Sequence, residues 1–200
     1  MNAELIPDKA EWRRRLRVGL NGLSPTQREE DSVRACDFLR RQPVWQNARA
    51  VLFYAPMAGE LDLTPLLEEA LQAGKTVALP SFVNETGTYQ ACAISDFRRD
   101  CQPGKFGIAE PRADALQIPL MRLDLALVPA LGFDASGRRL GRGRGFYDRL
   151  LAGIAGVKCG VAFDQQVVER LPAERHDVSM NYILTPTRWL ETSKPLPVKS

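Results

Sequence analysis

The feature that most constrains the fold is a series of short apolar runs that begins at residue 50. The runs lack polar alternation, and helical patterns or loops separate them. Such runs are typical of strands that are buried on both faces, as in a parallel sheet. We therefore predict strands at Ala50–Ala55, Thr76–Pro80, Tyr89–Ile94, Leu123–Pro129, Val157–Phe163 and Tyr182–Thr185.

Helix signals between these runs indicate crossover connections. Thr64-Pro65 is a typical helix start and Gly74 is a typical helix end, so residues 50–80 predict a β-α-β unit with parallel strands. A second helix, at about Gly145–Ile154, connects two later strands. The chain therefore predicts an α/β fold.

Two more helices are predicted before the first strand. Asp8 followed by Glu11 resembles a capping box, and apolar residues then recur at helical spacing. Ser24 as N-cap and Pro25 as the first helical residue begin the second helix, which ends before Pro43.

Composition narrows the class of protein. The 200 residues are 44% hydrophobic and 26% charged with a net charge of +3, which excludes a disordered or polybasic chain. The sequence contains no apolar run of about 18 residues and no signal-peptide core, so we expect a cytoplasmic protein without a membrane partner. Residues 1–185 predict a single domain. Residues 186–200 carry three prolines and predict a surface tail.

Four scattered cysteines and one histidine disfavour several catalytic classes. No Cys-x-x-Cys pair suggests a structural zinc site, and in a reducing cytosol we expect buried thiols. Zinc hydrolases commonly use two or three histidines, and no G-x-S-x-G elbow precedes His176. Zinc hydrolysis and Ser-His-Asp catalysis are therefore disfavoured.

The most informative motif lies between a predicted strand and a predicted helix. Gly141, Gly143 and Gly145 alternate with Arg142 and Arg144, so backbone amides can approach an anion while guanidinium groups neutralise it. Residues 138–149 hold five arginines and one aspartate, a local charge of +4 that exceeds the net charge of the chain. The motif predicts a phosphate-binding loop, with a flexible basic turn as the alternative.

Two standard nucleotide motifs do not fit. Phe146 stands where a dinucleotide-binding fingerprint needs a glycine. No acidic residue follows on a strand about 20 residues later, where it would hydrogen-bond the ribose. Gly74-Lys75-Thr76 resembles the end of a P-loop. It leads from a helix into a strand, however, which is the reverse of a P-loop's polarity, so it predicts a helix cap.

Acidic residues supply candidate metal and ligand contacts. Asp148 follows the Gly-rich loop and Asp177 lies far along the chain, and two such carboxylates could share a magnesium ion bound to nucleotide phosphates. Alternatively, Asp148 stabilises the helix N-terminus or pairs with Arg149. Glu60 follows the first strand, at the edge where α/β sheets bind ligands, and could accept hydrogen bonds from a heterocycle; a solvated glutamate is the alternative.

Two basic residues near the start of the chain are also candidates. Lys9 and Arg13 lie one turn apart on the polar face of the first helix. They could reach a phosphate or simply face solvent.

These segments together resemble the 5-formyltetrahydrofolate cyclo-ligase family. The most specific match is Arg139-Leu140-Gly141-Arg142-Gly143-Arg144-Gly145-Phe146-Tyr147-Asp148-Arg149. Five further blocks occur in the same order, and the resemblance extends from residue 9 to 185. These blocks are Lys9-x-x-x-Arg13, Met57-x-x-Glu60, Phe106-Gly107-Ile108-x-Glu110-Pro111, Val128-Pro129-x-x-x-Phe133-Asp134 and Leu171-Pro172-x-Glu174-x-His176-Asp177.

The resemblance implies an ATP-dependent ring closure that converts 5-formyltetrahydrofolate into 5,10-methenyltetrahydrofolate, releases ADP and phosphate, and requires magnesium. It also implies a three-layer α/β sandwich with a mainly parallel central sheet, here preceded by a pair of N-terminal helices. We expect a monomer that binds small molecules and no nucleic acid.

Site roles transfer by position. Arg142 and Arg144 would act on the reacting groups. The ATP-binding residues would be Lys9, Arg13, Arg139, Leu140, Gly141, Arg142, Gly143, Arg144, Gly145, Phe146 and Tyr147. The folate-binding residues would be Ala55, Glu60, Arg142, Gly143, Arg144, Gly145 and Phe146, and Asp148 and Asp177 would bind magnesium.

Departures from the family pattern are small. Many relatives carry glycine or lysine at Arg144 and tyrosine at Phe146, and the family varies at Ala55. None of these differences removes a backbone amide or a metal carboxylate.

The implied chemistry requires no nucleophilic side chain. ATP would phosphorylate the formyl oxygen, and the second folate nitrogen would then attack that carbon and expel phosphate. Such transfer depends on positioning and charge neutralisation. The sequence leaves two alternative functions: a non-catalytic folate- or nucleotide-binding protein, and a nucleic-acid-binding module that would rest on arginine clustering alone.

Overall fold

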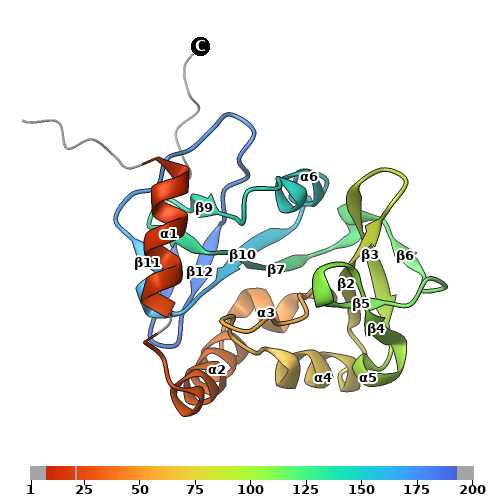
Figure 1. The fold of residues 1–200 in the computed structure, drawn as a ribbon. Coiled ribbons are helices and arrows are strands. Elements are labelled where there is room, and N and C mark those ends of the chain that lie inside the picture. The colour runs from red at the N-terminus through yellow and green to blue at the C-terminus, as the bar shows by residue number, and fades with distance from the viewer. Residues whose placement is uncertain (1–7, 21, 193–200) are drawn as a thin grey trace, which may run out of the picture.

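The computed structural model describes residues 8–20 and 22–192 and centres on an eight-stranded sheet (Figure 1). The strand order is β13-β12-β10-β7-β1-β2-β3-β6. Neighbours from β12 to β2 are parallel, whereas β13, β3 and β6 pair antiparallel at the two sides. The bounds are β1 (Ala50–Leu52), β2 (Thr76–Val83), β3 (Thr88–Ile94), β6 (Gln117–Ile118), β7 (Leu125–Pro129), β10 (Val157–Val161), β12 (Tyr182–Leu184) and β13 (Trp189–Glu191).

Helices cover both faces of this sheet. On one face, α2, α3 and α4 bury side chains such as Leu39, Trp45 and Leu66 in one core cluster. On the other face, α6 buries Leu150 and Leu151 in a second cluster. The predicted three-layer α/β architecture is confirmed. The helices are α1 (Lys9–Leu20), α2 (Pro25–Arg40), α3 (Pro43–Asn47), α4 (Thr64–Gln72), α5 (Phe97–Asp100) and α6 (Phe146–Ala152), with 3₁₀ turns η1 (Lys105–Gly107), η2 (Leu120–Arg122) and η3 (Asp164–Gln166).

Two small sheets lie outside the central one. A three-stranded sheet has the order β11-β8-β9, and a two-stranded antiparallel sheet contains β4 and β5. Leu16 of α1 packs on Leu131, Leu140 and Leu171 around the first of these. The predicted N-terminal helices therefore exist. Leu16 of α1 lies in this separate cluster, whereas Leu20 at the end of α1 packs against the same cluster as α2. The bounds are β4 (Cys101–Pro103), β5 (Ala109–Pro111), β8 (Gly132–Asp134), β9 (Arg139–Leu140) and β11 (Val167–Val168).

Local capping explains where the helices begin and end. The Glu11 amide donates to Asp8 Oδ1 at 2.8 Å, and the Gln27 amide donates to Ser24 Oγ at 3.1 Å. Gly74 has a φ of 74°, a left-handed conformation that favours glycine after a helix. The strand β2 follows directly, which confirms the helix cap in place of a P-loop.

The predicted surface tail at 186–200 is wrong in its first part. Trp189–Glu191 form β13, which pairs antiparallel with β12, and the Trp189 ring stacks on Tyr182 with centroids 4.8 Å apart. A strand of three residues is too short to show a periodic pattern, and cross-strand partners hold it in place. Residues 193–200 lie outside the described residues.

Two further features concern the hydropathy of the helices and the state of the cysteines. Within the described ranges, no helix combines the length and the hydropathy needed to cross a membrane. All four cysteines are free; Cys36, Cys92 and Cys159 are buried, as expected, whereas Cys101 is half-buried.

Candidate active site

A cavity of about 530 Å³ opens beside the carboxyl ends of the parallel strands. Its lining includes Ala55, just beyond β1, and Pro129, the last residue of β7. This is the edge where open α/β sheets bind ligands, and the volume is typical of small-molecule sites. Every residue that the resemblance assigns to ATP, folate or magnesium lines this one cavity. Their individual roles remain predictions.

The Gly-rich loop connects β9 to α6 and depends on two close approaches. A Cβ on Gly141 would lie 2.8 Å from Arg139 Nη1, so a side chain there would displace the guanidinium group. Gly143 has a φ of 100°, and a Cβ there would lie 3.3 Å from Arg13 Cζ. The glycines therefore let arginines from β9 and α1 pack against the loop backbone.

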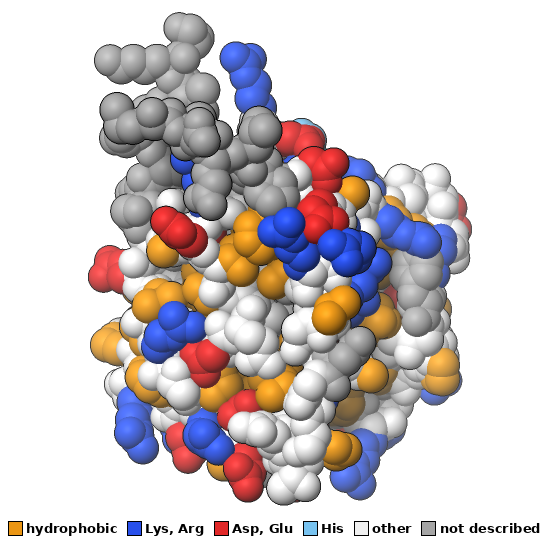
Figure 2. All heavy atoms as spheres, turned by 60° about the vertical axis from the view of Figure 1, so that its left-hand side comes forward, with side chains coloured by type: hydrophobic (Ala, Val, Ile, Leu, Met, Phe, Trp, Pro, Cys, Tyr) orange, Lys and Arg blue, Asp and Glu red, His pale blue; other side chains and the backbone are white. Residues whose placement is uncertain are grey.

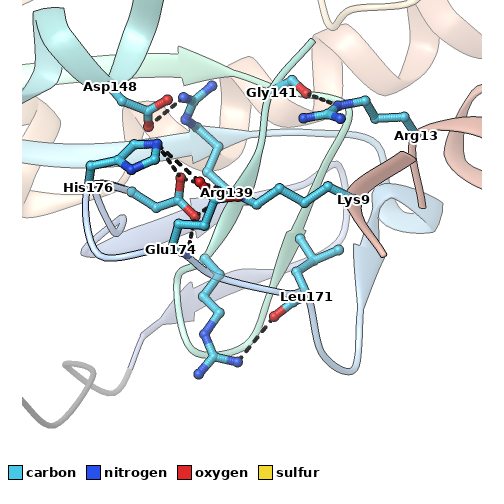
Figure 3. Close-up of polar contacts among 10 residues, drawn as sticks. Lys9, Arg13, Arg139, Gly141, Asp148, Leu171, Glu174 and His176 are labelled. Carbon is cyan, nitrogen blue, oxygen red and sulfur yellow. Dashed lines mark hydrogen bonds and ion pairs between the residues drawn. The ribbon is translucent and has the colours of Figure 1, made fainter. Parts of the chain in front are cut away.

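The helix α1 directs two cations at the cavity. Arg13 Nε donates to the Gly141 carbonyl at 3.1 Å (Figure 3). Lys9 Nζ lies 2.9 Å from an Asp177 oxygen and 3.0 Å from Glu174 Oε1, and its side chain is 19% exposed. Burial alone would lower the Lys9 pKa, but hydrogen bonds to Asp177 and Glu174 raise it overall, so Lys9 stays protonated. The alternative that both residues simply face solvent is wrong.

The two predicted metal carboxylates are already in ion pairs. Arg139 Nη2 donates to Asp148 Oδ1 at 2.8 Å, with side chains 4% and 14% exposed. Figure 3 shows these two side chains pointing toward each other. The alternative pairing with Arg149 is wrong, since Arg149 donates to the Gly87 carbonyl. Asp177 pairs with Lys9, so each carboxylate faces a residue assigned to ATP.

Glu60 is also in an ion pair within the cavity. Its Oε1 lies 3.2 Å from Arg142 Nη2, and its Oε2 accepts the Met57 amide at 3.0 Å. The side chain is only 10% exposed, so the alternative of a solvated loop glutamate is wrong. Asp148, Asp177 and Glu60 thus each have a cationic partner in the cavity.

The donor set is compatible with magnesium. Among the described residues, no group of three or more His, Cys, Asp or Glu side chains could hold a metal ion. Magnesium at nucleotide sites commonly uses one or two carboxylates, with phosphate and water oxygens completing the shell. Asp148 and Asp177 could supply carboxylates of that kind, and this role stays a prediction.

An aromatic cluster forms another part of the wall. Tyr89 lies edge-on to Phe82 and Phe146, with centroids 5.3 Å and 5.6 Å away, and it is tilted against Tyr147 at 6.3 Å. Burial raises the pKa of Tyr147 well above its usual value, so its hydroxyl stays protonated. Flat apolar rings of this kind suit a ring-bearing ligand.

Sequence reasoning missed several lining residues. Tyr54, Pro80, Tyr89 and Ala109 line the cavity but were assigned no role. Tyr89 begins a predicted strand, yet periodicity cannot tell which strand residues face a cavity. Glu174 belongs to a matched block, but its contact with Lys9 joins distant segments.

Positive and negative side chains are neighbours on the face shown in Figure 2. There, a group of Lys and Arg side chains lies directly beside Asp and Glu side chains.

Comparisons with known proteins agree with this site. The model of the 5-formyltetrahydrofolate cyclo-ligase family matches residues 6–186. The 5-formyltetrahydrofolate cyclo-ligase of Escherichia coli (strain K12) is 33% identical over 177 residues, which are 86% of this chain and 97% of the relative. The 5-formyltetrahydrofolate cyclo-ligase of Mycolicibacterium smegmatis is 37% identical over 151 residues, 71% of this chain and 76% of the relative.

Solved structures give the same result. The NMR structure of Aquifex aeolicus 5,10-methenyltetrahydrofolate synthetase matches with a TM-score of 0.83 and 31% identity, and the match covers 96% of both chains. A 5,10-methenyltetrahydrofolate synthetase from Mycoplasma pneumoniae has a TM-score of 0.72 at 19% identity, covers 90% of this chain and 99% of that chain, and supports the fold alone. With a cavity that gathers residues 139–148 of the matched signature, the chain belongs to the 5-formyltetrahydrofolate cyclo-ligase family of enzymes.

Proposed function

We propose that this chain catalyses the ATP-dependent closure of 5-formyltetrahydrofolate to 5,10-methenyltetrahydrofolate, with release of ADP and phosphate. One observation carries the proposal: the predicted ATP, folate and magnesium residues all line one cavity. Family membership and the names of the relatives support the same reaction.

The basic residues of the cavity would have two roles: some bind the triphosphate and others stabilise the transferred phosphoryl group. Lys9, Arg13 and Arg139 bind the triphosphate, because their head groups gather around the Gly-rich loop and the 174–177 segment. Arg142 and Arg144 lie on the loop itself and stabilise the phosphoryl group during transfer. Guanidinium groups match the bidentate geometry of phosphate oxygens better than ammonium groups do.

Folate binding would use a negatively charged residue, Glu60. Glu60 accepts hydrogen bonds from the amide and amino N–H groups of the pterin, which requires it to release Arg142. Binding of folate would therefore free Arg142 to meet the transferred phosphate.

Asp148 and Asp177 would hold magnesium. The bound ion would neutralise charge on the phosphate oxygens and help to orient them. Arg139 and Lys9, now paired with these carboxylates, would turn their charge toward the phosphates. Nucleotide and metal would therefore bind best together, since the phosphates would pair with the cations of the existing ion pairs and the metal with the carboxylates.

The reaction needs positioning more than side-chain chemistry. The formyl oxygen attacks the γ-phosphorus of ATP and ADP leaves. The second folate nitrogen then attacks the formyl carbon, loses its proton, and displaces phosphate as the C–O bond breaks. Arg142 and Arg144 neutralise the charge that develops on the transferred group, while the cavity holds the two substrates in line.

The experiment is a spectrophotometric assay with 5-formyltetrahydrofolate, ATP and magnesium. We expect an ATP-dependent rise in methenyl absorbance and an equal amount of ADP. Arg142→Ala should weaken substrate binding, whereas Arg98→Ala, the same change at an exposed position on α5, should behave like wild type. Tight folate binding without ADP formation at high protein concentration would contradict the proposal and indicate a non-catalytic binding protein.

A further inference from the structure

The β4–β5 ribbon, residues 101–111, forms one wall of the cavity although it is not part of the central sheet. Ile108, Ala109 and Glu110 line the cavity near its tip. In Figure 1 the ribbon lies beside β2, on the side of the molecule away from α1. Its position relative to β2 therefore determines the shape of the cavity at the end remote from Lys9 and Arg13.

A buried carboxylate connects the ribbon to the central sheet. Glu110 is 7% exposed, and its Oε2 accepts the Phe82 amide of β2 at 2.9 Å. Its Oε1 accepts the Lys105 amide of η1 at 3.0 Å. Hydrogen bonds from amides to a carboxylate are among the stronger ones, and here they come from two separate elements.

A second observation shows that the chain leaves space for this carboxylate. A Cβ on Gly104 would lie 2.4 Å from both Cγ and Cδ of Glu110. The φ of Gly104 is −103°, which any residue can adopt, so the requirement for glycine is space and not backbone conformation.

The position of Glu110 relates it to the aromatic part of the cavity. Burial raises the pKa of Tyr89, and the negative charge of Glu110 contributes to that rise. Glu110 also accepts the amide of Phe82, whose ring lies 5.3 Å from that of Tyr89, so the carboxylate lies beside the ring cluster. Lys105 Nζ also lies 3.7 Å from the centroid of the Phe82 ring, so the ribbon tip contacts the same strand residue twice.

We propose that Glu110 is a positioning residue for folate binding: it clamps the tip of the β4–β5 ribbon to β2, so that Ile108 and Ala109 form a fixed wall for the ring-bearing part of the folate. The proposal rests on the proposed function for the identity of the ligand. The clamp itself is a property of the unliganded chain.

Two variants test the clamp by different routes. Glu110→Gln keeps the shape but leaves one acceptor oxygen for two amides, because the amide nitrogen cannot accept a hydrogen bond. Gly104→Ala keeps the carboxylate, but the added methyl group occupies the space that the Glu110 side chain needs. The matched control is Gln102→Ala, at the exposed position of β4 that faces Glu110 in the ribbon.

Residue-resolved hydrogen exchange provides a readout that does not depend on catalysis. We expect the Phe82 and Lys105 amides to be protected in wild type and in Gln102→Ala, and to exchange faster in both test variants. In steady-state assays we expect the KM for 5-formyltetrahydrofolate to rise about tenfold, with kcat and the KM for ATP changed by less than about twofold.

The outcomes separate the clamp from the proposed function. Rapid exchange of both amides in wild type would overturn the clamp, and so would an unchanged folate KM in variants that have lost protection. A similar rise in the KM for folate and the KM for ATP, together with a fall in kcat, would indicate general loss of structure. That result would overturn a specific role of Glu110 in folate binding. If wild type forms no methenyl product, the proposed function fails. Calorimetric affinity for folate then decides the clamp: about tenfold weaker binding in both variants supports it, and equal or absent binding overturns it.

Discussion

Replacing Asp148 should destabilise the fold before any effect on catalysis is considered. Arg139 is 4% exposed and its Nη2 lies 2.8 Å from Asp148 Oδ1. Within the described residues, Arg139 Nε is buried without a hydrogen-bond partner, so the guanidinium group depends on Asp148 for compensation. If Asp148 acted only as a metal ligand, Asp148→Ala would lose turnover and fold normally. The structure instead predicts that a buried cation is left unpaired.

The magnitude follows from the degree of burial. Breaking a fully buried ion pair by removing one partner costs about 3–5 kcal/mol. Asp148 is 14% exposed and lines a cavity that admits water, so we expect a smaller loss of about 2–3 kcal/mol in the free energy of unfolding. For a chain of this size, this corresponds to a decrease in melting temperature of about 4–12 °C.

The assay is thermal unfolding followed by circular dichroism, in buffer with EDTA and without ATP. Asp114→Ala, at an exposed position, should melt like wild type. The double variant Arg139→Met/Asp148→Leu should recover most of the stability, since a hydrophobic pair of similar volume can replace a buried ion pair, while activity stays lost. Equal melting temperatures for Asp148→Ala and wild type would refute the reasoning, and so would a double variant less stable than Asp148→Ala.

Three further predictions concern the ligands and the thiols. Glu60→Gln should weaken folate binding about tenfold, because the charge that accepts the pterin N–H groups is lost; calorimetry showing unchanged affinity would contradict this. EDTA should abolish ADP formation but leave the melting temperature unchanged, since Asp148 and Asp177 have cationic partners within the chain; a lower melting temperature on chelation would disagree. Burial raises the pKa of Cys36 and Cys101 to about 11, so both thiols are protonated at neutral pH. Iodoacetamide labelling should therefore be slow at pH 7 and accelerate only as the pH approaches 11, and a midpoint near that of a free thiol would exclude the effect.

Sequence patterns predicted the central elements well, because their causes are local. Continuous apolar runs predicted β7 and β10, which are buried on both faces, and the Ser24 cap predicted the start of α2. The two-residue strands were not predicted. The strands β9 and β11 contain only two residues each, and nothing in two residues distinguishes a strand from a loop.

In the candidate site, too, local features were predictable from the sequence and long-range contacts were not. The alternating glycines and arginines indicated an anion-binding loop. This motif is visible in the sequence because all of its residues lie within one short segment. The contacts that organise the cavity are long-range: Lys9 and Asp177 are 168 positions apart, and Glu60 and Arg142 are 82 apart. No local pattern identifies such partners.

Sequence by itself therefore determined the α/β class, the positions of the main strands and the resemblance of the Gly-rich loop to a cyclo-ligase signature. Only the tertiary structure decided that Asp148, Asp177 and Glu60 each face a cation, and that Glu110 joins a separate ribbon to β2. The physical reason is that propensity, capping and periodicity act over a few residues. Ion pairs and buried carboxylates instead depend on which distant segments the packed core brings within hydrogen-bond distance.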